Sequence, residues 1–98
     1  MKEVKGIFKI DQSFNLTNMG IVVSGHFIEG LPLFGCFLIV DIDGHPATVR
    51  IKGIERGKFD AEGKMLWGIL LHFDDLSLEK IAETNRIKEQ ILEIFAMS

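Results

Sequence analysis

The stretch FKIDQSFNLTNMGIVVSG, residues 8–25, decides the fold class of this chain. Two short pieces in which apolar and polar residues alternate, Phe8–Ile10 and Phe14–Leu16, lead into a β-branched run that ends at Gly25. Alternation and β-branched residues are typical of strands, and a glycine inside a strand marks a bulge or a tight barrel corner. Two more glycines follow at five-residue intervals. The stretch therefore predicts a small β-barrel.

The next part of the chain continues this pattern. Asp43-Gly44 separates two apolar runs and is a strong hairpin signal, because both residues tolerate the positive φ of a tight turn. Polar residues and two glycines predict a loop over 56–64. The expected fold is mainly β, a small closed antiparallel barrel of Greek-key type with six or seven strands. We expect its longer strands over residues 4–10, 19–28, 34–42, 47–54 and 65–73.

The last quarter of the chain has a different composition, with no glycine or proline after residue 75. Asp75 or Ser77 can cap a helix that begins there, and apolar residues recur at roughly helical spacing. The pattern predicts one C-terminal α-helix over residues 76–97. Its apolar stripe consists of Leu78, Ile81, Ile87, Ile91, Ile94 and Phe95.

Two of the expected strands carry apolar residues at successive positions, Phe37–Val40 and Trp67–Leu71. A strand with one face in water should alternate, so both faces of these strands must be covered. The helix over 76–97 is the expected cover, packed on its own barrel, which we favour, or on a partner. The candidate protein-interface residues are Trp67, Leu71, Ile87, Ile91 and Phe95.

Composition and charge narrow the classes of function. The 98 residues suit a single domain, with the barrel over 1–75 and the helix over 76–97. A formal net charge of −3 gives no general attraction to phosphates. The single cysteine, Cys36, cannot form an internal disulfide. No apolar run is long enough to span a bilayer and none follows residues 1–5 as in a signal peptide, so we expect a cytoplasmic protein without membrane contact.

No motif in the chain points to catalysis. His26, His45 and His72 have no metal-ligand spacing with one another or with the cysteine. Gly63-Lys64 lacks the upstream glycine and the following Ser or Thr of a phosphate-binding loop. We therefore expect no catalytic residue, no metal, no nucleotide and no other cofactor, and we expect that the protein is not an enzyme.

Basic residues cluster in the middle of the chain, next to Phe59. Residues two apart share one face of a strand, and a basic strand with an aromatic residue is typical of single-stranded nucleic-acid binding. Nearby acidic residues dilute the charge, so a solvated hairpin is the favoured interpretation and RNA contact is the alternative. The candidate RNA-contact residues are Arg50, Lys52, Arg56 and Lys58.

Several of these features, taken in order, resemble the second-domain β-barrel of the translational GTPases, the barrel of elongation factor Tu-like proteins. The resemblance covers residues 7–74. The matching elements are Phe8-Lys9-Ile10, Phe14-Asn15-Leu16, Gly20-Ile21-Val22-Val23-Ser24-Gly25, Glu29-Gly30, Gly35, the strand over 49–55, and Gly63 followed by the strand over 67–71. Cys36 and Lys64 stand where the family often has Asp, and no GTPase domain accompanies the barrel.

In that family the barrel contacts tRNA ends, ribosomal RNA or neighbouring domains, so the resemblance implies a stand-alone binding module. We expect a non-catalytic module that acts through protein–protein contacts, with a homo-oligomer among the expected partners. The alternative is an RNA- or ribosome-associated factor that uses the basic hairpin.

Overall fold

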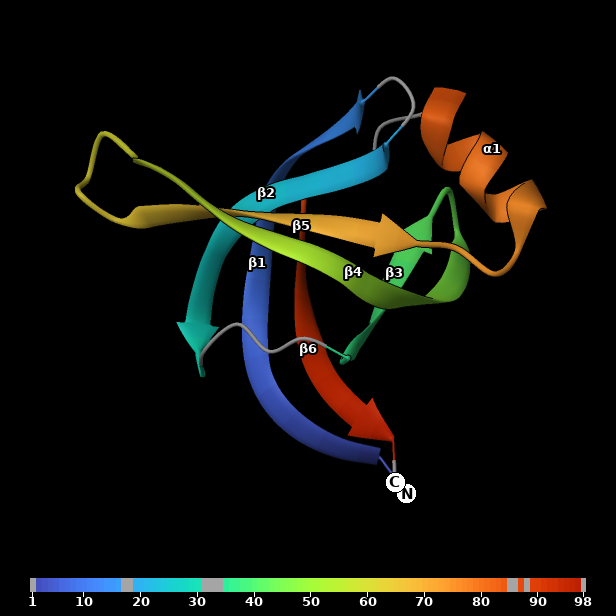
Figure 1. Ribbon diagram of the computed structural model, residues 1–98, viewed down its shortest axis with the longest axis horizontal. Helices are drawn as coiled ribbons and strands as arrows, with labels where there is room; N and C mark the ends of the chain where they lie inside the picture. The colour runs from blue at the N-terminus through green and yellow to red at the C-terminus, as the bar shows by residue number, and fades with distance from the viewer. Residues whose placement is uncertain (1, 17–18, 31–34, 85–86, 88, 98) are drawn as a thin grey trace.

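The computed structural model describes residues 2–16, 19–30, 35–84, 87 and 89–97. Six strands and one short helix make up this part of the chain (Figure 1). The strands pair in the order β1-β2-β5-β4-β3-β6 and close into a barrel, with every pair antiparallel. The elements are β1 (Lys2–Leu16), β2 (Gly20–Glu29), β3 (Phe37–Ile42), β4 (His45–Phe59), β5 (Met65–His72), α1 (Leu76–Thr84) and β6 (Gln90–Met97). The expectation of a mainly β, closed antiparallel barrel is confirmed.

The barrel is filled by the apolar residues at alternate strand positions. Seven of the core side chains have no measurable exposure, and they come from β1, β2, β3, β5 and β6. Apolar burial is the main favourable term in folding, so these inward rows stabilise the closed sheet. The fully enclosed side chains are Phe8, Ile10, Val23, Leu38, Val40, Ile69 and Ile94.

Two local predictions from glycine are confirmed. Asp43 and Gly44 have φ values of 52° and 86° and form the tight turn between β3 and β4. Gly25 pairs with Ile10, where β1 shifts its register against β2 before Gln12. A side chain at Gly25 would collide with the Lys9 carbonyl oxygen, so the absence of a Cβ lets the two strands approach closely.

The prediction of one helix over 76–97 is wrong. The helix ends at Thr84, and residues 90–97 form strand β6. Ile94 of the predicted stripe is buried together with Leu92, two residues away, whereas Ile91 of the same stripe is 65% exposed, which is the alternation of a strand. The decisive factor is tertiary: β6 pairs with β1 on one side and β3 on the other, and without it both edges would be open.

Helix α1 lies at one end of the barrel, near β2 and β3 (Figure 1). The Asp75 carboxylate accepts hydrogen bonds from the backbone N–H groups of Ser77 (2.9 Å) and Leu78 (3.4 Å), so Asp75 is the N-cap. After the helix, the Ile87 backbone N–H donates to the buried Ser13 hydroxyl at 2.9 Å. The Ser13 bond attaches the segment between the helix and β6 to strand β1.

Two strand boundaries also differ from the expectations, and a third lies outside the described residues. The piece Phe14–Leu16 is continuous with β1, because β1 follows β2 beyond the bulge at Asp11. Strand β4 runs to Phe59, so only part of the loop expected over 56–64 exists, as a turn between β4 and β5. The turn expected to continue from Gly30, and the start of the strand expected at 34, fall on residues 31–34, outside the described residues.

Candidate functional site

Strand β5 presents two apolar rows, one on each side of the sheet. Ile69 and Leu71 pair with inward residues of β2 and β4 and are buried. Leu66, Gly68 and Leu70 alternate with them and therefore point outward. Leu66 and Leu70 remain half-buried rather than enclosed. The apolar run 67–71 thus has one face in the core and one on the outer surface.

The outer face of β2, β5 and β4 is hollowed. A cavity of about 350 Å³ lies there, and a neighbouring hollow of about 320 Å³ shares Val22, Glu55 and Gly68 with it. We call the two together the outer groove. The larger cavity is lined by Leu16, Met19, Val22, Gly53, Ile54, Glu55, Gly68 and Leu70.

Two glycines form the floor of the outer groove. A Cβ at Gly53 would lie 3.6 Å from the Leu70 Cβ, and one at Gly68 would lie 3.5 Å from the Val22 Cγ1. These are ordinary packing distances, so a methyl group would fit at both positions and would occupy part of the space. The missing side chains leave the neighbouring apolar groups facing a cavity instead of one another.

Exposed apolar side chains border the outer groove. Phe14 is 43% exposed, Leu16 41% and Met19 56%. Single exposed apolar residues are normal on a protein surface, but a contiguous patch beside a hollow is typical of a binding surface. None of the groove-lining residues comes from α1, so the shortened helix does not provide the cover expected for this face.

The five candidate interface residues do not form one surface. Trp67 points inward and makes an edge contact with Phe27, their ring centroids 5.7 Å apart at 82°. Leu71, Ile87 and Phe95 are buried within the chain, and Phe95 stacks on Phe37 of β3. Only Ile91 is widely exposed, at 65%, and it lies on β6.

The groove residues of β2 and β5, Val22 and Leu70, were missed by the sequence reasoning. The alternation of β5 was a usable signal, because the row that contains Leu70 cannot face the same way as the row that contains Trp67. The sequence could not say which row was inner, since both are apolar.

The four basic residues fall into two groups. Arg50 and Lys52 are exposed on the outer side of β4, alternating with buried residues as expected, and the Arg50 guanidinium lies 5.8 Å from the Phe37 ring centroid. Arg56 and Lys58 are exposed further along, on the part of the β4–β5 hairpin that projects from the barrel (Figure 1).

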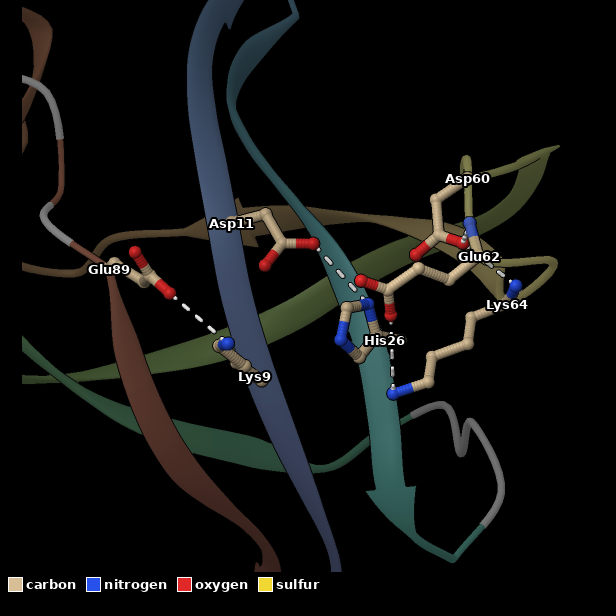
Figure 2. A network of polar contacts seen from close by, with 7 residues as sticks. All are labelled: Lys9, Asp11, His26, Asp60, Glu62, Lys64 and Glu89. Atoms are coloured by element: carbon tan, nitrogen blue, oxygen red, sulfur yellow. Dashed lines mark hydrogen bonds and ion pairs between the residues drawn. The ribbon is translucent and has the colours of Figure 1, made fainter.

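Polar side chains of β1, β2 and the turn between β4 and β5 form a group of contacts (Figure 2). The His26 Nδ1 lies 3.3 Å from an Asp11 carboxylate oxygen, at an ion-pair distance but without the alignment of a hydrogen bond. Lys64 lies 4.0 Å from Glu62 across the turn. A hollow of about 460 Å³ lies next to His26 and Lys64. Its lining residues are His26, Phe27, Ile28, Lys64, Met65 and Trp67.

Asp60 organises the turn at the hairpin tip. Its carboxylate accepts the backbone N–H groups of Lys64 (2.8 Å) and Glu62 (2.9 Å). The hydrogen bond from Lys64 is the largest influence on the carboxylate and lowers the pKa of Asp60, against a smaller opposing effect of desolvation. This is a turn-stabilising role.

The described residues contain no group of three or more His, Cys, Asp or Glu side chains placed to hold a metal ion. Cys36 is buried and unpaired by a disulfide. In the described part of the chain, no helix is long and apolar enough to cross a membrane. No family model, no curated protein and no solved structure matches the chain.

Proposed function

We propose that the chain is a non-catalytic binding module that holds a protein partner in the outer groove. The observation that carries this proposal is the hollow of about 350 Å³ on the outer face of β2, β5 and β4, bordered by exposed apolar side chains. In the sequence, the apolar run 67–71 indicated that both faces of this strand must be covered. In the structure, its outer face is not covered by α1, so this face is the surface that a partner would cover.

The mechanism would be burial of this apolar surface against an anchor side chain. A cavity of this size is at the lower end of the range for small-molecule sites, which suits one or two side chains of a partner. Buried apolar area contributes roughly 25 cal/mol per Å², so removing one large side chain from water yields about 1.5–3 kcal/mol. Interfaces commonly depend on a few such anchors.

We include in this proposal the resemblance of the chain to the second-domain barrel of translational GTPases. The strand order supports a Greek-key type, because β5 is inserted between β2 and β4 and the chain must cross to join them. In the related barrels the fold serves as a docking module, and we propose the same general role here. A second copy of the chain is one form that the partner could take.

Site-specific photo-crosslinking tests the proposal. A photoreactive amino acid at Met19, on the border of the groove, should form adducts with a partner in the native cells. The same residue at Ile91, equally exposed but on β6, is the matched control and should form none. Adducts of equal yield from both positions, or none from Met19, would contradict a binding role for the groove. An adduct with the mass of two copies would identify self-association.

A second candidate function is RNA binding by the projecting hairpin. Arg56, Lys58 and Phe59 are all exposed there, Phe59 to 66%, which combines charge with a stacking surface. Replacing Arg56 and Lys58 by Ala should weaken binding to single-stranded RNA and reduce its dependence on salt, because fewer phosphates would be neutralised. RNA binding that is unchanged by both substitutions would exclude this candidate.

A further inference from the structure

The described part of the chain leaves one edge of the β4–β5 hairpin without a strand partner. Strand β3 pairs with β4 only as far as Arg50, and the Ile51 backbone N–H donates to the Cys36 carbonyl at 2.8 Å. Among the described residues, no strand lies beside residues 53–59 on the side opposite β5. Figure 1 shows this part of the hairpin extending away from the barrel. An edge of this kind presents backbone N–H and C=O groups that another chain can pair with.

Cations flank this edge. Lys52, Arg56 and Lys58 are all exposed, and within the described part of the chain none of them has an ion-pair partner. Glu55 is the one acidic residue between them, in a chain whose net charge is −3. The local excess of positive charge is complementary to an acidic strand.

A second copy of this chain does not fit the edge. Two copies related by a two-fold axis would pair as antiparallel strands. Residues directly opposite one another point to the same face of the sheet. The axis must therefore pass through a residue and not between two residues. An axis at residue 55 or 56 places Glu55 or Arg56 opposite itself. An axis at 54 or 57 extends the pairing into the register shifts of β4 between Ile51 and Gly53 or between Arg56 and Phe59, where the strand is not regular. Like charges directly opposite destabilise a strand pair, so the edge favours a different, acidic sequence.

The outer groove lies beside the same edge. Gly53 pairs with the outward Leu70, so its missing side chain opens the groove at the edge. A large apolar side chain on an added strand can lean over a cross-strand glycine and fill such a space. The register shift between Arg56 and Phe59 ends the regular stretch, so the paired segment is short.

We propose that residues 53–56 of β4 accept an extended acidic segment of a partner protein as an added strand, with one large apolar side chain in the outer groove. This inference rests on the proposed function and names the chemistry of the partner. Backbone hydrogen bonds supply the attachment, and Arg56 and Lys58 select for carboxylates.

Short fluorescent peptides test the proposal on the full chain. The probe is a peptide in which Glu alternates with Val around a central Phe. The first control has the same sequence with alternate backbone nitrogens methylated, and the second replaces Glu by Lys. We expect fluorescence anisotropy to show saturable binding of the acidic peptide, and binding weaker by at least about tenfold for each control. Equal binding of the methylated peptide, or no binding of the acidic one, would overturn the proposal. The latter result would mean that the cations and the bulge protect the edge from pairing.

Two variants locate the interaction. Arg56→Gln should weaken the acidic peptide by about tenfold, whereas Arg50→Gln, on the part of β4 that is paired with β3, should leave it unchanged. Equal effects of both variants would refute the edge as the site. Tighter binding of an oligouridylate probe with the same dependence on Arg56 would favour the RNA function and overturn this proposal. Crosslinking from Met19 without any effect of peptide methylation would leave the proposed function intact and remove only the added strand.

Discussion

Gly25 should be the glycine whose replacement by alanine costs the most stability among those in regular strand conformation. Its backbone conformation is one that any residue adopts, so the penalty of Gly25→Ala comes from packing alone. The new methyl group would overlap the Lys9 carbonyl oxygen and lie 2.8 Å from the Lys9 carbonyl carbon and 3.1 Å from the Ile10 Cα. These are backbone atoms of β1, which cannot rotate out of the way.

Accommodating the methyl group requires β1 and β2 to separate at the bulge. Strand β1 is also paired with β6, so the displacement would strain the barrel on both sides. Overpacking typically costs about 1–3 kcal/mol, and the upper part of that range applies because the obstacle is backbone. Removing a glycine from a strand returns about 0.5–1 kcal/mol. The net expectation is a loss of about 2 kcal/mol, or roughly 8–16 °C in Tm for a chain of this length.

Urea unfolding followed by circular dichroism measures this loss, with Gly68→Ala as the matched control. Gly68 is also in a strand of the same sheet, but its added methyl group would meet only the Val22 side chain at 3.5 Å and the Glu55 carbonyl oxygen at 4.0 Å. Its stability should equal that of the parent or exceed it by up to about 1 kcal/mol, because replacing a glycine within a strand returns about 0.5–1 kcal/mol. The m-value should be unchanged in both, so that the midpoint reports stability. Equal midpoints for Gly25→Ala and Gly68→Ala would refute the close approach of β1 and β2.

Three further predictions concern single polar groups. Ser13→Ala should lower the free energy of unfolding in urea by about 1–3 kcal/mol, because it leaves the buried Ile87 N–H without its acceptor. Ser13→Thr keeps the hydroxyl, so an equally large loss in that variant would argue against this cause. The side-chain amide of Gln90 bridges β3 and β6, because it accepts a hydrogen bond from the Asp41 N–H at 2.9 Å and donates one to the Asp41 carbonyl oxygen at 2.8 Å. Gln90→Ala should therefore lower the free energy of unfolding by about 1–2 kcal/mol. A stability equal to that of the parent would contradict the bridge. The folded-state pKa of Asp60 lies below its unfolded value, so its contribution to the hairpin turn is present above the unfolded pKa and is lost as the pH falls through the folded pKa. NMR titration of its carboxyl carbon should show the lowered pKa, and an unshifted titration would refute the turn geometry.

Much of the barrel could be predicted from local signals. The Asp43-Gly44 turn follows from two residues that tolerate positive φ, and a glycine within a β-branched run indicated the irregularity that the structure shows as a bulge of β1 opposite Gly25. The sequence also offered Asp75 or Ser77 as the N-cap of the helix, and the structure selects Asp75. Such features depend on a few neighbouring residues, so the sequence contains all the information that they need.

The end of the chain shows where local signals fail. Residues 87–95 suit a helix or a strand by apolar spacing, and only the open edges of β1 and β3 make the strand the better choice. Because these partners are far away in sequence, no local window contains the deciding interaction. The same limit applies to the candidate interface, since Phe95 and Leu71 are buried by strands that the sequence cannot place beside them.

By itself, the sequence determined the strand-rich class, the turns and the presence of more apolar surface on Trp67–Leu71 than one face of a sheet can use. Only the tertiary structure decided which row of β5 is inward, that Gly53 and Gly68 meet in one groove, and that no described strand pairs with the β4 edge beyond Ile51. The physical reason is that composition and alternation act within one strand, whereas a groove or an edge exists only once the neighbouring strands are in place.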